Sequence, residues 1–262
     1  MVTTPAATVD APPTMDQRIT FPSVTWAEFE VMLAIRGDNA GIRMTYLNGA
    51  LELMSPSLDH EGIETVIARL LEIYALEMGI PLNGFGSWTL KNPLRARALE
   101  PDECYAVSTG RPARPDLAIE VIWTSGGIDK LEVYRGLGVG EVWIWREGAI
   151  EVHVLVADNY RRGEQSALFP GLDLAELASF IDPEDQTAAV RRYRDALARS
   201  PVRLQVGMPP TRSRGRGSSG FPRCRPGPAD PLRPGPRCSP TGCPRSVRAG
   251  RRLRSPAGYA LR

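Results

Sequence analysis

The segment that most restricts the fold of this chain spans residues 114–145 and reads RPDLAIEVIWTSGGIDKLEVYRGLGVGEVWIW. It contains an apolar run typical of a strand, a short loop, a helix expected at about 128–137 and a second strand-like run. Strands that alternate with helices are typical of the α/β class. The first strand also carries two carboxylates, Asp116 and Glu120, and the helix carries Lys130. Burying a lone carboxylate costs several kcal/mol, so the segment predicts that these acids have partners.

A hairpin and two helices are expected before this segment. A threonine is a suitable N-cap for a helix over 25–36. Asn48-Gly49 separates two short apolar runs and is the strongest short-range signal for a hairpin turn. Over 60–79, apolar side chains recur at helical intervals, which predicts one wide apolar stripe on a helix that a glycine ends.

Strands and one last helix complete the expected elements. The sequence Asp182-Pro183-Glu184-Asp185 has the N-cap, the N1 proline and the acidic first turn of a helix start. That helix is expected to run to about residue 199. The strands are expected near 82–90, 101–108, 114–123, 141–147 and 149–156.

Charge is divided unevenly along the chain. Residues 209–262 contain 13 arginines and a single acid, Asp230, so they carry about +12, whereas residues 1–208 carry about −10. This tail is rich in Arg, Pro, Gly and Ser and cannot bury enough apolar surface to offset the loss of chain entropy. We therefore expect a flexible arm at 1–17, one domain at 18–200 and a disordered basic tail at 201–262. Two interpretations of the tail stay open: a nucleic-acid-binding segment, or a fused or out-of-frame coding segment.

The termini and the cysteines indicate the compartment. The first residues lack the basic and apolar regions of a signal peptide, and no apolar run reaches the ~18 residues of a transmembrane helix. Cys104 is the only cysteine before the tail, and the other three lie within it, which is not a disulfide framework. We therefore expect a cytoplasmic protein with no membrane partner.

The two acids of the central strand cannot hold one ion together, because residues four apart on a strand lie ~13 Å apart at 3.3 Å per residue. Asp102, at the head of the preceding strand, is a better partner for Glu120, since adjacent strands lie ~4.8 Å apart. Two converging carboxylates suit Mg²⁺ or Mn²⁺, which takes few protein oxygens and keeps several waters. Lys130 shares a helix face with Tyr134, and from there it could stabilise developing charge or orient a water.

Four segments of the chain resemble the Uma2 family of restriction-endonuclease-like proteins, which have the PD-(D/E)xK nuclease fold. They are YLNGALELMSPSLDHEG, EPDECYAV, the segment at 114–145 and FPGLDLAELASFIDPED, and they occur in order over about residues 20–200. The resemblance implies an α/β fold in which a mixed sheet is flanked by helices. It also implies a site with an Asp on one strand and an acid-x-Lys on the next.

In this pattern Asp102 and Glu120 match the acidic places. The sequence departs from the pattern at Ile122, which stands where the lysine is expected, and Lys130 on the following helix is the matching position. His60 matches a histidine of the family pattern and opens the apolar face of its helix. Glu52, on an apolar strand of the hairpin, is expected beside the same site.

Each of these residues also has an ordinary structural interpretation. Asp102 could be a turn residue, Lys130 a surface lysine, His60 a helix cap or core histidine. Glu52 could equally serve the fold alone. Asp116 is expected to terminate its loop or to support the site from behind.

Taken together, the residues predict metal-dependent hydrolysis of phosphodiester bonds in DNA. Asp102 and Glu120 would bind Mg²⁺ or Mn²⁺, Lys130 would assist the attacking water, and His60 and Glu52 would complete the rim of the site. RNA as substrate is one alternative. Another is a catalytically degenerate nuclease-fold module that binds DNA or a protein partner, which the charge of −10 favours because nucleic acid must meet a cationic surface. DNA is the expected partner, and a homodimer is compatible with the sequence.

Overall fold

The computed structural model describes residues 14–39, 41–123 and 126–199, and the structural statements below concern these residues. The chain divides into two compact units, Met1–Pro210 and Thr211–Arg262, and the described residues belong to the first. The tail expected at 201–262 therefore lies outside them. In chain order the elements are β1 (Gln17–Phe21), α1 (Trp26–Arg36), β2 (Arg43–Leu47), β3 (Ala50–Ser55), α2 (Leu58–Met78), β4 (Asn83–Gly84), β5 (Leu90–Asn92), η1 (Pro93–Arg95), β6 (Arg97–Leu99), β7 (Glu103–Ala106), β8 (Leu117–Val121), α3 (Lys130–Leu137), β9 (Glu141–Arg146), β10 (Ala149–Val156), β11 (Asn159–Gly163), α4 (Leu174–Ser179) and α5 (Gln186–Arg199).

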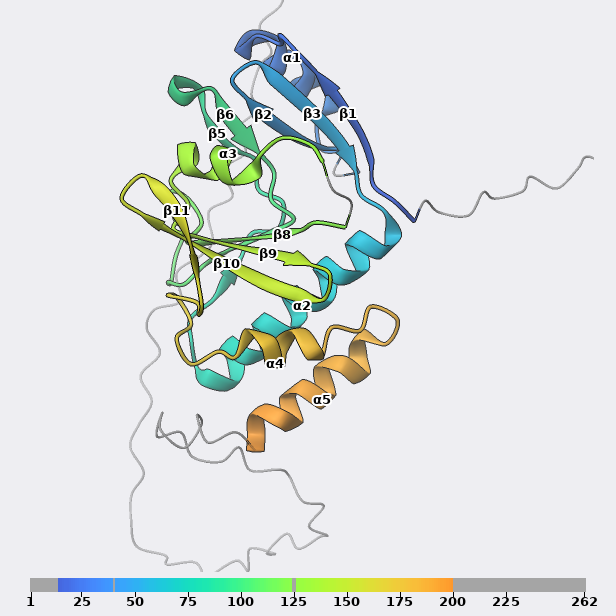
Figure 1. The fold of residues 1–262 in the computed structure, drawn as a ribbon, viewed down its shortest axis with the longest axis vertical. Helices are drawn as coiled ribbons and strands as arrows, with labels where there is room; N and C mark the ends of the chain where they lie inside the picture. The colour runs from blue at the N-terminus through green and yellow to red at the C-terminus, as the bar shows by residue number, and fades with distance from the viewer. Residues whose placement is uncertain (1–13, 40, 124–125, 200–262) are drawn as a thin grey trace, which may run out of the picture. The chain divides into compact units, whose positions relative to one another are not determined.

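The strands form two sheets. One is antiparallel, with the order β1-β3-β2-β6-β5, and the other has six strands in the order β11-β10-β9-β8-β7-β4. In the second sheet β8 and β9 are parallel and the other pairs are antiparallel. Figure 1 shows the five-stranded sheet with α1 on its outer side, and α2, α4 and α5 beyond the six-stranded sheet. The expected mixed sheet with flanking helices is confirmed, and the structure adds a second sheet beside it.

Local signals account for the first elements. The side chain of Thr25 accepts a hydrogen bond from the backbone of Glu28, whose carboxylate bonds back to Thr25, so a complete capping box begins α1. The predicted hairpin is formed by β2 and β3. Asn48 and Gly49 both have positive φ, 48° and 94°, which is the conformation that a two-residue hairpin turn needs.

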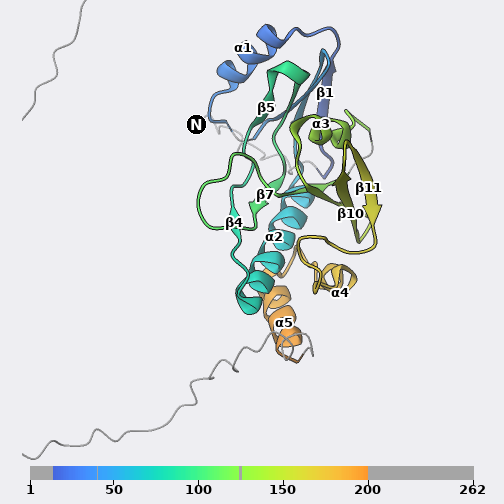
Figure 2. The ribbon, with the colours of Figure 1, turned by 90° about the vertical axis from the view of Figure 1, so that its left-hand side faces the viewer.

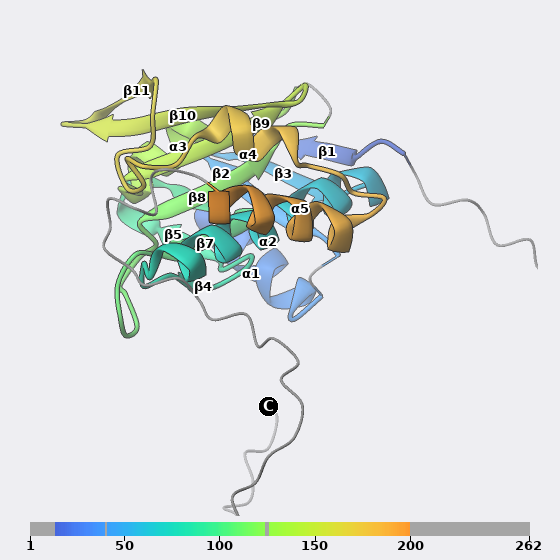
Figure 3. The same ribbon diagram turned by 90° about the horizontal axis from the view of Figure 1, so that it is seen from below.

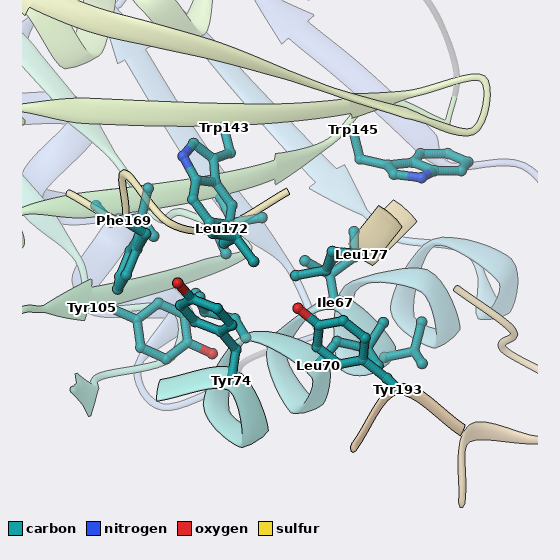
Figure 4. Packing of buried hydrophobic residues seen from close by; sticks show 14 of the residues in the cluster. Ile67, Leu70, Tyr74, Tyr105, Trp143, Trp145, Phe169, Leu172, Leu177 and Tyr193 are labelled. Carbon is teal, nitrogen blue, oxygen red and sulfur yellow. The ribbon is translucent and has the colours of Figure 1, made fainter. Parts of the chain in front are cut away.

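The main hydrophobic core lies between the six-stranded sheet and α2, as Figure 4 shows. Trp143 of β9 and Tyr74 of α2 both meet Phe169 edge-on, with ring centroids 5.8 and 6.4 Å apart. Leu70 of α2 and Tyr193 of α5 are buried in the same cluster. In Figure 3, α5 runs beside α2 on this face of the sheet. Burying each large apolar side chain contributes ~1.5–3 kcal/mol, so this layer holds α2 against the sheet.

A second core lies on the other face of the six-stranded sheet. It joins Ala118 and Ile144 of that sheet to Leu99 of the five-stranded sheet and to Val133 and Tyr134 of α3. Helix α3 is therefore packed between the two sheets, as Figure 2 shows from the side. Successive side chains of a strand point to opposite faces, so Glu120 lies on the same face as Ala118 and points toward this second core.

Two expected elements are wrong in detail. The strand expected near 82–90 is broken, because Asn83–Gly84 pairs with β7 while Leu90–Asn92 pairs with β6 in the other sheet. The last helix begins at Gln186, three residues after Pro183, and the carboxylate of Asp185 accepts a hydrogen bond from the backbone N–H of Ala188 in the first turn. Asp182 instead accepts a hydrogen bond from the backbone of Asp185 and so closes the turn before the helix.

The N-terminal boundary also differs from the expected one. Asp16 and Gln17, which the sequence places in the flexible arm, belong to the folded domain. Gln17 begins β1 opposite Ser55, and Asp16 accepts a hydrogen bond from the backbone of Ser57. Among the described residues, no helix is both long enough and apolar enough to span a membrane.

Candidate active site

The antiparallel register of β7 and β8 brings the two predicted acids together. Glu103 pairs with Ile119 and Cys104 with Ala118, so Asp102, one residue before β7, stands opposite Glu120. Opposed residues of antiparallel strands share a face of the sheet. Asp102 also accepts a hydrogen bond of 2.6 Å from the backbone N–H of Val121, which locks its carboxylate to the end of β8. Both acids are almost fully buried, each with 1% of its surface exposed.

Helix α3 supplies the partners of Glu120. Asp129 caps the helix, Lys130 is its first residue, and Tyr134 lies one turn later on the same face. The Lys130 ammonium donates to Oε2 of Glu120, and the Tyr134 hydroxyl donates to Oε1. Burial raises the pKa of Glu120, and the Asp102 charge adds to this, so the nearby lysine offsets only part of the rise. Lys130 is the predicted lysine, and the structure places it on the predicted acid.

Lys130 stays charged in this environment. Burial by itself lowers the pKa of the ammonium, but the charges of Glu120 and Asp102 outweigh burial and raise the pKa above its ordinary value. The lysine therefore brings a permanent positive charge to both acids. A charged lysine in such a position can stabilise negative charge, although it cannot act as a base while it is protonated.

Asp102 is held by two cationic side chains from other elements. The Arg43 guanidinium, at the start of β2, donates to Oδ1, and Nε2 of His60 lies 3.1 Å from Oδ2. Burial alone would raise the pKa of Asp102. The positive charges of Lys130 and Arg43, together with the His60 contact, overcome burial and lower the pKa well below its usual range. Asp102 is therefore ionised at neutral pH.

Arg43 connects Asp102 to the first turns of α2. Its Nη2 lies 2.9 Å from a Glu61 oxygen and 2.6 Å from a Glu64 oxygen. Burial and the Asp102 charge raise the pKa of Glu64 to about 8, against the opposing effect of Arg43. The sequence gives Arg43 no pattern of its own, so it was not predicted.

His60 lies in the network and is completely buried. Ser57 caps α2 by accepting from the backbone of His60, which fixes the imidazole at the end of the helix that faces the sheets. Its Nδ1 lies 3.2 Å from Asp16, and its Nε2 faces Asp102. Burial lowers the pKa of the imidazole, but the hydrogen bonds to Asp102 and Asp16 outweigh burial and raise the pKa to about 9. The ring is therefore an imidazolium at neutral pH and donates to both carboxylates.

Glu52 is buried on β3, and it contacts the loop before α3. Its Oε2 accepts a 3.2 Å hydrogen bond from the backbone of Ile128. A Cβ at Gly127 would collide with the same carboxylate. Glu52 therefore supports the loop leading to Lys130. Among the described interactions, none joins Glu52 to Asp102 or Glu120. Asp116 accepts a 2.9 Å hydrogen bond from the backbone of Val107, which fits the predicted loop role.

The donor set fits a hard divalent cation. Asp102 and Glu120 are ionisable oxygen donors on one face of the sheet, and each influences the other's charge. Carboxylate oxygens are the ligands that Mg²⁺ and Mn²⁺ prefer. In the described part of the chain, one ligand atom each from His60, Glu64 and Asp102 also lies within 4.8 Å of the others. The chemistry of the residues thus suits metal binding, although the lysine and the arginine now neutralise the acids.

Three residues of the site were not predicted from the sequence, or were predicted only in part. Glu64 follows His60 by one helical turn, so the spacing could have indicated that it shares the same face. Tyr134 was recognised only as a companion of Lys130 on its helix face. Arg43 had no local signal, because its partners come from α2 and from the residue before β7.

One known protein family matches most of the described domain. The sequence model of the Uma2 family, described as "Putative restriction endonuclease", matches residues 26–190. That range includes Asp102, Glu120, Lys130 and His60. No curated protein matches the chain. The match covers more than half of the sequence and nearly all of the described domain, so the chain belongs to the Uma2 family of restriction-endonuclease-like proteins.

Proposed function

We propose that this protein is a metal-dependent endonuclease that hydrolyses phosphodiester bonds in DNA. The observation that carries the proposal is the position of Asp102 and Glu120. They are buried side by side at the ends of two paired strands, and Lys130 is bound to one of them. Burying two acids together is costly unless cations compensate their charges, and a bound metal ion is one such cation. Membership of a family described as "Putative restriction endonuclease" supports the same activity.

Asp102 and Glu120 would hold the ion, Mg²⁺ or Mn²⁺. A bound divalent ion polarises a phosphate and lowers the pKa of a bound water. The chain's own residues would position the acids and supply charge. The backbone of Val121 and the His60 imidazolium hold Asp102, while the Tyr134 hydroxyl holds one oxygen of Glu120. The Lys130 ammonium would stabilise negative charge that develops on the phosphate. Glu52 would act indirectly, by holding the loop from which Lys130 projects.

The test uses the full chain with covalently closed plasmid DNA and Mg²⁺ or Mn²⁺. We expect nicked or linear products from the parent, and none in the presence of EDTA. Glu120→Gln should lower the rate by about 100-fold or more, the size typical of losing a charged contact at the reacting centre. Glu164→Gln, which changes an exposed acid far along the chain, is the matched control and should keep the parental rate. Equal nicking by the parent and Glu120→Gln would reject the assignment.

The same proposal has three further parts: the substrate is DNA, the protein is cytoplasmic, and it assembles as a homodimer. The family description supports DNA. The homodimer has support from β1, which is an edge strand that exposes Ile19 and Phe21. Competition between plasmid DNA and single-stranded RNA for cleavage separates the two substrates. Light scattering on the purified chain measures the assembly, and cell fractionation measures the compartment.

A second function is favoured by one observation. All four carboxylate oxygens of Asp102 and Glu120 already accept hydrogen bonds, from Arg43, the Val121 backbone, Lys130 and Tyr134. A network satisfied in this way could also belong to a module that has lost catalysis and binds DNA or a protein. Calorimetric titration with Mn²⁺ discriminates the two, because a degenerate site should release no binding heat, whereas an active site should bind the ion.

A further inference from the structure

Arg43 occupies a central position among the acids on the α2 side of Asp102. It begins β2, and its side chain is only 7% exposed. Its guanidinium donates to three carboxylates: to Asp102 through Nη1, and to Glu61 and Glu64 through Nη2 at 2.9 and 2.6 Å. A guanidinium keeps its charge at every accessible pH. One permanent positive charge is therefore shared among three acids, two from α2 and one from the residue before β7.

The space that the guanidinium fills is also bounded by residues of the types that bind metal ions once they are deprotonated. Ligand atoms of His60, Glu64 and Asp102 lie within 4.8 Å of one another, and all three residues are buried. Arg43 contacts each of them, including Nε2 of His60 at 3.1 Å. Both ring nitrogens of His60 face carboxylates, Asp16 on one side and Asp102 on the other. Among the described residues, the Arg43 guanidinium thus already contacts all three of these possible ligands.

Metal-dependent nucleases commonly use two ions about 3.5–4 Å apart, which share a carboxylate. Asp102 is the residue that could be shared here, because Glu120 lies opposite it on one side and Glu64 and His60 approach it on the other. A second divalent ion on the Glu64 side would meet the guanidinium at contact distance. Like charges at that distance repel strongly in a buried site, where water does not screen them.

We propose that Arg43 is a fixed cation in the place of a second divalent ion, so that this site binds one metal ion and not two. The inference rests on the proposed function for the first ion, which Asp102 and Glu120 would hold. Arg43 is a positioning residue under this proposal. It neutralises the Glu64 side of Asp102 by donating a hydrogen bond to Oδ1 of that carboxylate.

The test counts the Mn²⁺ ions bound to the full chain at pH 7.5, by calorimetric titration and by electron paramagnetic resonance of free Mn²⁺. The parent should bind one ion per chain. Glu120→Gln should abolish that binding, whereas Glu64→Gln should leave one ion, because Glu64 belongs to the Arg43 side. This part of the test needs no change at Arg43, so it stands even where an Arg43 variant does not fold.

The second part removes the guanidinium. Arg43→Met should bind two ions per chain, and Mn²⁺ should raise its melting temperature more than it raises that of the parent. Methionine replaces the unbranched stem of the arginine without its charge, and it is a poor ligand for a hard cation. Arg97→Met is the matched control, because Arg97 is another buried arginine of the same sheet and pairs with Glu132, outside the site. This control should bind one ion, like the parent. Circular dichroism checks that both variants are folded.

The outcomes separate the two proposals. Two ions in the parent, one of them lost in Glu64→Gln, overturn the role of Arg43 but leave the metal site of the proposed function intact. One ion in both the parent and folded Arg43→Met also overturns it. No ion in the parent and one in Arg43→Met supports Arg43 as the stand-in cation and rejects the Asp102–Glu120 site. No ion in either protein rejects both.

Discussion

The hydroxyl of Tyr134 donates a hydrogen bond to Oε1 of Glu120, and both side chains are buried. Burial, and then the neighbouring carboxylate charge, raise the pKa of Tyr134 well above its ordinary value. The hydroxyl is therefore a permanent donor. Because Lys130 occupies the other oxygen, the orientation of Glu120 is set from both sides by one face of α3.

Removing the Tyr134 hydroxyl should weaken the fold measurably. Tyr134→Phe deletes a hydrogen bond to a buried charge and should lower the free energy of unfolding by roughly 1.5–3 kcal/mol. Tyr160→Phe is the matched control, since its hydroxyl donates to the neutral backbone carbonyl of Val139 at 2.6 Å. That change should cost only about 0.5–1.5 kcal/mol. Urea unfolding of both variants gives the comparison, and an equal or larger loss in Tyr160→Phe would contradict the charged character of the Glu120 bond.

The stability of the domain should fall as the pH rises from about 6.5 to 9. The folded-state pKa of His60 is raised to about 9 from an ordinary value of 6.5, so its stabilising contribution is complete below pH 6.5 and is lost as the pH passes 9. Glu64 acts in the same direction, because its pKa is raised to about 8. The expected loss for His60 alone is roughly 1–3 kcal/mol. Chemical unfolding at pH 6.5 and at pH 9.5 measures it.

Two histidine variants isolate this effect. His60→Gln should flatten the decline in stability between these pH values, although the variant is less stable at pH 6.5. His153→Gln should leave the decline in place, because burial lowers the pKa of His153, whereas the decline needs a group whose pKa is raised. Parallel pH profiles for the parent and His60→Gln would show that the imidazolium network does not contribute in this way.

The loop before α3 should tolerate no side chain at Gly127. This residue has a φ of +94°, and a Cβ there would collide with the Glu52 carboxylate and approach Arg18. Gly127→Ala should therefore lower the melting temperature, and it should reduce any nuclease activity because the loop leads directly to Lys130. Gly110→Ala is a matched control with a similar φ of +99° but with open space around the added carbon. Its loss should be the smaller of the two, about 1 kcal/mol from backbone strain alone. Thermal unfolding with equal losses would show that strain, and not the Glu52 contact, explains the effect.

Cys104 should resist alkylation in the folded protein. Burial raises the pKa of its thiol to about 12, and the side chain is completely buried in the sheet. At pH 8 the thiolate fraction is on the order of 10⁻⁴, so both reactivity and access are low. Peptide mapping after treatment with iodoacetamide should find Cys104 unmodified without denaturant and modified in guanidinium chloride. Rapid modification of Cys104 under native conditions would show that β7 opens readily.

The local elements of the fold could be predicted because their signals lie within a few residues. The capping box at Thr25, the turn at Asn48-Gly49 and the apolar stripe of α2 each depend on neighbours in the sequence, and each is present in the structure. The predicted start of α5 was wrong, because Asp182 and Asp185 each close a turn and are equivalent candidates for the cap. Packing against the core, where Ala189 and Tyr193 are buried, decides between them.

The site also has features that the sequence predicts and features that depend on tertiary packing. The sequence by itself determined that Glu120 lies within a buried strand and that Lys130 follows on a helix, because alternation and helical spacing are properties of contiguous residues. Only the tertiary structure decided that Arg43 and His60 meet at Asp102. Their partners are 59 and 42 positions away in the chain, and strand register and helix packing bring them together. Charges this far apart in sequence have no shared pattern, so the balance of acids and cations at this site exists only once the sheets and α2 have packed.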